Sequence, residues 1–131
     1  MEVLSSRVLL RAADLETSVA WYRDVLGLRV AREFGTDGRI TGVVFFLGGG
    51  HLEISQSGSG AMSPNGGALT LWLQVPDLDA EHARLVALGV TIDSPPTRMP
   101  WGLDEMWAQD PDGVRLVLIE VPDDHPLRRR L

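Results

Sequence analysis

The pattern of apolar and polar positions repeats once along the chain. Residues 7–30 (RVLLRAADLETSVAWYRDVLGLRV) and 70–92 (TLWLQVPDLDAEHARLVALGVTI) each open with the alternation typical of a β-strand. In each segment an aspartate, an apolar stripe at helical spacing and a glycine follow, which predicts a helix with both ends marked. The two helices are therefore expected over residues 14–27 and 77–89.

Strand-like runs separated by turn residues follow each predicted helix. These runs are residues 28–33, 39–47 and 51–56 in the first half and residues 90–93, 103–109 and 114–121 in the second. The sequence thus predicts an α+β protein of two βαβββ modules, at about residues 5–56 and 68–121. Residues 57–67 (SGSGAMSPNGG) are expected to form a linker and residues 122–131 a polar tail, whereas Asp110-Pro111-Asp112-Gly113 predicts a tight turn.

Alternation gives the first and last strand of each module one aliphatic face and one mixed face. The aliphatic faces are expected to pack beneath the helices. The mixed faces suit the lining of a concave ligand site, and the alternative interpretation is a partly wet sheet surface with solvated charges. The mixed-face residues are Arg7, Leu9, Arg11, His51, Glu53, Ser55, Thr70, Trp72, Gln74, Arg115, Val117 and Ile119.

Composition excludes several classes of protein. The 131 residues carry a net charge of −6, which argues against a general nucleic-acid binder despite the arginines at 128–130. No apolar run reaches the ~18 residues that a membrane helix needs, so a cytoplasmic protein is expected. The chain has no cysteine, so disulfides and thiolate metal sites are excluded, and only histidines and carboxylates remain as transition-metal ligands.

Four blocks of the sequence resemble the vicinal oxygen chelate superfamily, which includes glyoxalase I, extradiol dioxygenases, fosfomycin-modifying enzymes and bleomycin-binding resistance proteins. The blocks are DLETSVAWYRDVLGL (14–28), HLEIS (51–55), LQVPDLDA (73–80) and PWGLDEMWAQDPDGVRLVLIE (100–120). The resemblance implies two βαβββ modules whose mixed sheets curl into a concave cleft, with the helices on the outer face and usually in a homodimer. It is weak evidence for any one activity, because one fold hosts many chemistries.

The resemblance also locates the metal ligands of the metal-dependent members, typically a His and a Glu in each half. The corresponding positions here are Arg7, Glu53, Thr70 and Val117. Only Glu53 is a usual ligand, since a guanidinium stays protonated and valine has no donor atom. We therefore expect no metal and no other cofactor. A bidentate ion pair between Arg7 and Glu53 is our hypothesis for what replaces the metal, and a Glu53 that points into solvent is the alternative.

His51 and Glu53 lie on one strand face two residues apart, which keeps open a displaced metal site. The other histidines do not complete it: His82 falls on the stripe of the second helix and His125 in the tail. Two candidate ligands without a third do not make a site.

Three of the four tryptophans are candidates for the apolar walls of a ligand site. Trp72 lies on a mixed face, Trp101 lies just before the last strand pair, and Trp107 lies within it. Aromatic faces stack on flat rings and attract cations, whereas the arginines of the mixed faces favour an anionic or carbonyl-rich ligand. The sign of the ligand's charge therefore stays open. Trp21 lies off the first helix stripe, where it would border a subunit contact.

The sequence thus predicts a metal-free protein that sequesters a bulky, partly aromatic, antibiotic-like small molecule in a dimer cleft. The alternative is a glyoxalase-like lyase, isomerase or dioxygenase, with a displaced metal at His51 and Glu53 or with Glu53 as a base. A dimeric interaction module without a pocket is a third hypothesis. The expected ligand contacts are Arg7, Leu9, Arg11, His51, Glu53, Thr70, Trp72, Gln74, Trp101, Trp107, Arg115 and Val117.

Overall fold

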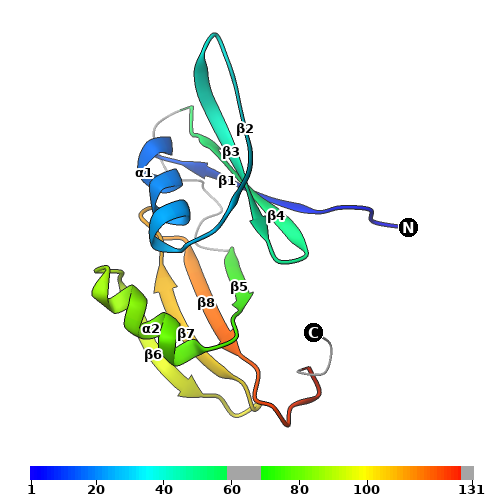
Figure 1. Cartoon of the computed structure of the whole chain (residues 1–131), viewed down its shortest axis with the longest axis vertical. Helices are drawn as coiled ribbons and strands as arrows, with labels where there is room; N and C mark the ends of the chain where they lie inside the picture. Colours follow the sequence, from blue (N-terminus) through cyan, green and yellow to red (C-terminus); the bar gives the residue numbers. More distant parts are fainter. Residues whose placement is uncertain (59–68, 128–131) are drawn as a thin grey trace. The chain divides into compact units, whose positions relative to one another are not determined.

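A computed structural model describes residues 1–58 and 69–127 of the chain (Figure 1). The chain divides into two compact units, Met1–Pro64 and Asn65–Leu131, called module one and module two below. Most of the expected linker, residues 59–67, and the end of the expected tail, residues 128–131, lie outside the described residues. No helix in the described part of the chain is long and apolar enough to cross a membrane.

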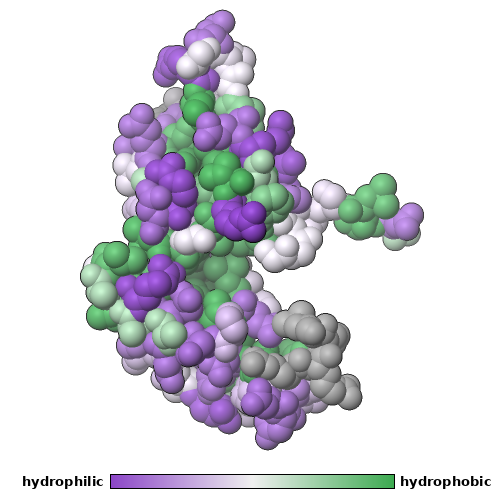
Figure 2. Space-filling view, viewed as in Figure 1, coloured by the Kyte–Doolittle hydropathy of each residue, from purple (hydrophilic) through white to green (hydrophobic). Residues whose placement is uncertain are grey.

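Module one is a four-stranded mixed sheet with a helix on one face. Its elements are β1 (Arg7–Ala12), α1 (Leu15–Ala20), η1 (Trp21–Val25), β2 (Val30–Thr36), β3 (Arg39–Leu47) and β4 (Gly50–Gln56). The spatial order of the strands is β1-β4-β3-β2, and β1 runs parallel to β4 while the other neighbours are antiparallel. The residues before β1 extend away from this sheet with Val3 and Leu4 exposed (Figures 1 and 2).

Module two repeats this plan. Its elements are β5 (Thr70–Gln74), α2 (Leu78–Ala87), β6 (Ile92–Arg98), β7 (Asp104–Gln109) and β8 (Arg115–Glu120). The strand order β5-β8-β7-β6 matches that of module one, with β5 parallel to β8. The predicted α+β fold of two βαβββ modules is therefore confirmed, and both sheets are open.

The first helix departs from the single regular helix that the sequence predicts. After α1 the chain continues as the π-helical η1, in which the Leu26 N–H donates to the Trp21 carbonyl at 2.8 Å. The helix then ends at Gly27, whose φ of 90° is favourable only for glycine. The next strand begins at Val30 instead of residue 28.

The edge strand β6 is longer than the sequence predicts. It continues to Arg98 through Pro95 and Pro96, two residues that normally end a strand prediction. Proline lacks the backbone N–H that an inner strand needs for its second neighbour, but an edge strand has only one neighbour. The position of β6 at the end of the sheet therefore tolerates both prolines.

Each helix begins with a hydrogen bond to the last strand of its own module. The Leu15 N–H donates to Gln56 Oε1 at 2.9 Å, and the Leu78 N–H donates to Glu120 Oε1 at 2.8 Å. These N–H groups have no partner within the helix, so an acceptor on the strand satisfies them. The contacts fix where each helix starts over its sheet.

The aliphatic strand faces pack beneath the helices, as predicted. Tyr22 of η1 is fully buried, with its ring 6.3 Å from that of Phe45 on β3 and 4.9 Å from that of Trp21. Phe45 therefore faces the helix, and Phe46, the next residue, faces the opposite side. Other buried residues of these cores are Leu10, Ala12, Leu15, Val43, Leu52, Ile54, Leu71, Leu78, Leu85, Met106, Leu116 and Leu118.

The predicted turn between the last two strands is confirmed. Asp110 Oδ1 accepts the N–H groups of Asp112 and Val114, each at 2.8 Å, and Gly113 has a φ of 81°. An aspartate that hydrogen-bonds the backbone ahead of it is a common way to close such a turn. The turn sets β8 in register with β7.

Candidate functional site

The sheet face of module one opposite α1 carries three rows of side chains across its strands. Residues paired in the register share a face, so the rows follow from the strand pairing. From β1 outward the rows are Arg7, His51 and Phe46; Leu9, Glu53, Val44 and Arg32; and Arg11, Ser55, Gly42 and Phe34. These eleven residues, with Arg29 beside Phe46, are called the open face of module one.

Arg7 and Glu53 form the ion pair that the sequence predicts. Arg7 Nη1 donates to Glu53 Oε1 at 2.7 Å, and the Glu53 side chain is only 15% exposed. The contact is single, so the bidentate geometry predicted from the sequence is wrong. Arg7 is paired with His51 in the register and reaches Glu53 diagonally from the neighbouring row, and this approach explains why only one nitrogen makes the contact.

The other three arginines of the open face differ from Arg7 in their surroundings. Within the described residues, no carboxylate lies within ion-pair distance of Arg11, Arg29 or Arg32. Two of them lie near aromatic rings: the guanidinium carbon of Arg29 is 6.0 Å from the Phe46 centroid, and that of Arg32 is 5.5 Å from the Phe34 centroid. Both are cation–π distances. The open face is therefore locally positive on a chain whose net charge is −6.

Two large apolar side chains on the open face remain accessible to solvent, whereas Val44 in the middle row is buried. Leu9 is 65% exposed and Phe46 is 48% exposed, and the ring of His51 lies 5.6 Å from that of Phe46. Exposed large apolar groups next to fixed polar groups are the usual composition of a ligand surface.

Sequence analysis missed Arg32 and Phe34 because it assigned faces only to the first and last strand of each module, and Phe34 lies beyond the predicted run 28–33. The strand β2 is also irregular. The register with β3 shifts between Val30 and Arg32, so simple alternation from Val30 assigns Arg32 and Phe34 to the helix side. A bulge reverses this parity and turns both side chains to the open face. Phe46 carried a usable signal, since it follows the buried Phe45 in a strand that the sequence predicts correctly.

The corresponding face of module two is partly closed by its own apolar cluster. Its rows are Thr70, Arg115 and Gln109; Trp72, Val117, Trp107 and Ser94; and Gln74, Ile119, Glu105 and Thr97. Val117 is 3% exposed and packs with Leu103, Ile119 and Val121, against which Trp107 also packs. Val117 was expected to contact ligand, but it is buried in this cluster.

The three candidate tryptophans have different surroundings. Trp72 is 51% exposed, whereas Trp107 packs on the cluster with the Arg115 guanidinium carbon 4.6 Å from its ring centroid. Trp101 is 56% exposed, and its Nε1 donates to Glu105 Oε2 at 2.7 Å. Glu105, which the sequence analysis missed, lies two residues before Trp107 on β7 and therefore on the same face. Trp72 is therefore the exposed aromatic residue of this sheet face.

The residues at the superfamily's metal positions do not fit a metal ion. Arg7 and Val117 offer no ligand atom, and the Glu53 Oε1 atom already accepts a hydrogen bond from Arg7. Among residues 1–58 and 69–127, no three side chains of His, Asp or Glu form a group that would hold a metal. His51 contacts the Phe46 ring, and His82 lies half-buried on α2.

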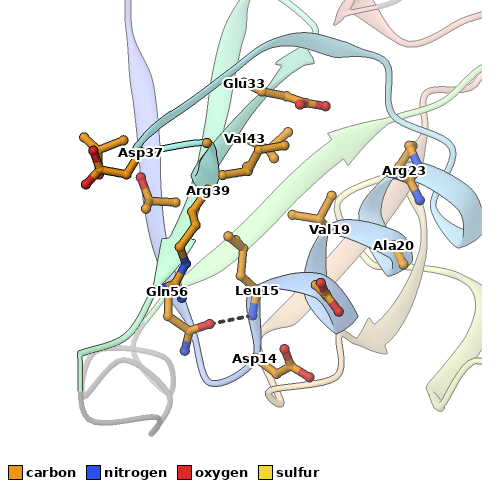
Figure 3. Close-up of a pocket in the computed structure, with 15 residues that line it drawn as sticks. Asp14, Leu15, Val19, Ala20, Arg23, Glu33, Asp37, Arg39, Val43 and Gln56 are labelled. Carbon is orange, nitrogen blue, oxygen red and sulfur yellow. Dashed lines mark hydrogen bonds between the residues drawn. The ribbon is translucent and has the colours of Figure 1, made fainter.

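A separate hollow of about 1020 Å³ lies on the helix side of module one, between α1 and the β2–β3 hairpin (Figure 3). Its walls combine Leu15, Val19 and Val43 with carboxylates such as Glu33, and none of the predicted ligand contacts lines it. Val43 shares a face of β3 with Phe45, which faces the helix. The hollow is therefore distinct from the open face.

The charge of Arg23, which borders the hollow, is neutralised locally. Its Nε and Nη2 atoms donate to the two carboxylate oxygens of Asp24 at 2.8 and 2.9 Å. These hydrogen bonds raise the pKa of Arg23 and lower the pKa of Asp24. The carboxylates that line the hollow, on Asp14, Glu16, Glu33 and Asp37, share its wall with one further arginine, Arg39.

Comparison with known families identifies the class of protein. The family model described as Glyoxalase/Bleomycin resistance protein/Dioxygenase superfamily matches residues 5–118. The chain therefore belongs to this superfamily, as the resemblance of its sequence blocks predicts. None of the curated proteins compared with the chain matches it.

Solved structures share the fold at low sequence identity. TnmS3, an antibiotic binding protein from Streptomyces sp. CB03234, is 22% identical with a TM-score of 0.75, covering 92% of this chain and 98% of its own. TioX from Micromonospora sp. ML1 is 24% identical with a TM-score of 0.72, over 89% and 95% of the two chains. Lactoylglutathione lyase from Agrobacterium tumefaciens is 20% identical with a TM-score of 0.68, over 92% and 94%.

Proposed function

We propose that the protein binds and sequesters a planar, partly aromatic, antibiotic-like small molecule without the help of a metal ion. The observation that carries this proposal is the exposure of Leu9, Phe46 and Trp72, at 65, 48 and 51%, on sheet faces opposite the helices. Leu9 and Phe46 lie in rows with charged side chains, whereas the row of Trp72 holds Val117, Trp107 and Ser94. Such faces offer apolar area for binding and polar groups for orientation.

The comparisons support the class of ligand. One of the structures with this fold, TnmS3, is described as an antibiotic binding protein, and the superfamily includes bleomycin resistance proteins. At 22% identity TnmS3 establishes only that the fold is suited to the task. We extend the proposal to a homodimer, the usual assembly of the superfamily.

The Arg7–Glu53 ion pair supports binding without a metal. A cation at Glu53 would have to displace a guanidinium bound at 2.7 Å and would lie among the positive charges of the open face. The same contact disfavours the lyase, isomerase or dioxygenase alternative with His51 and Glu53 as ligands. It also disfavours Glu53 as a base, since the Oε1 atom already accepts a hydrogen bond from Arg7.

A binding screen tests the proposal. Planar aromatic antibiotics are ranked by the rise in Tm of the protein, and the Kd of each hit is measured by quenching of tryptophan fluorescence, with and without EDTA. We expect saturable binding that EDTA leaves unchanged, and recovery of the ligand intact by mass spectrometry. A requirement for added Fe, Mn, Ni or Zn, a chemically altered ligand, or no hit in the panel would each overturn it.

A further inference from the structure

We infer that the open face of module one selects a planar aromatic anion, a ligand with two or three fused rings and a carboxylate or a similar acidic group. This inference rests on the proposed function, because it assigns a ligand class to the same surface. It resolves the sign of the ligand's charge, which the sequence analysis leaves open.

The charge of the face is the first argument. Its ionisable groups are four arginines and one glutamate, with one histidine beside them. Glu53 is neutralised by Arg7 at 2.7 Å, whereas Arg11, Arg29 and Arg32 have no carboxylate within ion-pair distance in the described part of the chain. Three uncompensated guanidinium groups on one sheet face attract an anion and repel a cation. A carboxylate also matches their paired N–H donors.

The shape of the face is the second argument. Phe34, Phe46 and His51 present rings, and Leu9 adds an exposed aliphatic surface in the middle row. The guanidinium groups of Arg29 and Arg32 lie over the Phe46 and Phe34 rings, at 6.0 and 5.5 Å from the ring centroids. Flat rings stack on both kinds of group, so the face favours a planar body over a compact inorganic anion.

The width of the face sets the size of the ligand. Arg11 on β1 and Arg32 on β2 belong to the two edge strands of the sheet. Four strands spaced about 4.8 Å apart place the edges about 14 Å from each other. A body of two or three fused rings with an acidic group fits within this distance. A long polyanion such as single-stranded nucleic acid would extend beyond it toward a chain of net charge −6, which opposes its binding.

Three probes with one ring system isolate the contribution of charge. They are 2-naphthoate, neutral 2-naphthamide and the 2-naphthylmethylammonium cation, each measured by equilibrium dialysis against the full chain. We expect 2-naphthoate to bind roughly tenfold or more tightly than the amide, and the cation to bind weakest. Equal affinity for the amide, or tighter binding of the cation, would overturn the inference.

Charge-neutral variants locate the site. Arg11→Gln and Arg32→Gln should each weaken 2-naphthoate binding roughly three- to tenfold and change 2-naphthamide binding less than about twofold. Arg39→Gln is the matched control: Arg39 is exposed on the same sheet and without an ion pair in the described residues, but it lines the hollow on the helix side. An equal loss of 2-naphthoate affinity in Arg39→Gln would mean that only the total charge of the protein matters, and this would contradict the inference.

The remaining outcomes separate this inference from the proposed function. If antibiotics of the panel bind but no naphthalene probe depends on Arg11 or Arg32, the ligand class is wrong and the proposed function stands. If neither set binds, both fail. Tighter binding of a single-stranded oligonucleotide than of 2-naphthoate would assign the face to nucleic acid. Self-association that Arg11→Gln abolishes, with 2-naphthoate binding unchanged, would assign it to a second copy of the chain.

Discussion

The guanidinium of Arg7 donates to the carboxylate of Glu53 at 2.7 Å, diagonally across two parallel strands. In metal-dependent members of the superfamily these two positions carry metal ligands. The Glu53 side chain is 15% exposed, so its negative charge depends on Arg7 for compensation. The positive group that this carboxylate requires therefore comes from the chain itself.

Removing one partner of this pair should destabilise the protein more than removing both. We expect Arg7→Ala to lower the free energy of unfolding by about 1–2 kcal/mol, because Glu53 then keeps a half-buried charge without a partner. The double variant Arg7→Ala/Glu53→Leu should recover part of that loss. A double-mutant cycle compares the unaltered protein, the two single variants Arg7→Ala and Glu53→Leu, and the double variant by urea denaturation. It gives the coupling energy of the pair, and a coupling of zero would contradict the pairing.

Trp72 and Trp107 should separate binding from stability. Trp107 packs on the cluster of Val117 and its neighbours, so Trp107→Ala should cost about 3 kcal/mol or more of stability. Trp72 is 51% exposed, so Trp72→Ala should cost less than about 1 kcal/mol and should instead weaken any ligand held on module two. Denaturation midpoints and the Kd of a hit from the antibiotic panel measure the two effects. Equal loss of stability in both variants would contradict this assignment.

The hydrogen bonds at the starts of the helices predict that two substitutions of Glu120 differ in their effect on stability. Glu120→Gln keeps an oxygen acceptor for the Leu78 N–H and should change stability little, whereas Glu120→Ala should cost about 1 kcal/mol or more. Gln56→Ala should have a similar cost, since Gln56 Oε1 accepts the Leu15 N–H. Protection of these two amides in hydrogen exchange is the direct measurement. Unchanged protection in Gln56→Ala would show that solvent replaces the side chain.

The strand faces could be predicted because they depend on local pattern alone. Alternation in β1 and β4 places Arg7, Leu9, Arg11 and Glu53 on one face, and the structure confirms this arrangement. The ion pair followed from that placement together with the superfamily resemblance, which located the two strands next to each other. Alternation cannot give the distance or the number of contacts, which is why the single hydrogen bond from Arg7 was not foreseen.

The exposure of individual residues could not be predicted in the same way. Trp72 and Trp107 share a face and a residue type, but only Trp107 packs on the cluster that includes Leu103 and Val121. Leu103 and Val121 lie one residue beyond β7 and β8, and alternation places them on the same face as Trp107 and Val117. Alternation gives the face of a side chain but not how closely its neighbours cover it. Burial of Val117 follows from the same packing, so the pattern that placed it on the mixed face gave no signal that it is covered.

The Arg23–Asp24 pair predicts a pH effect that stays local. Hydrogen bonds from Arg23 hold the pKa of Asp24 below its ordinary value, so any stability it contributes is present at neutral pH and is lost as pH falls through this lowered pKa. Because Asp24 is exposed, we expect no measurable change in Tm from Arg23→Gln at neutral pH. An NMR titration should show the pKa of Asp24 rising toward its ordinary value in that variant. An unchanged titration would contradict the pairing.

Phe34 and Gly42 provide a test of the bulged strand β2 on which the open face depends. A Cβ added at Gly42 would overlap the Phe34 ring, so Gly42→Ala must displace that ring. We expect a loss of about 1–3 kcal/mol. In a Phe34→Ala background the same change should be neutral or stabilising by about 0.5 kcal/mol, because glycine within a strand is unfavourable. Gly42→Ala should also weaken 2-naphthoate binding, since the displaced ring leaves its position beside Arg32. Additive effects of the two substitutions on unfolding would mean that Phe34 does not cover Gly42, and that β2 turns its side chains as simple alternation predicts.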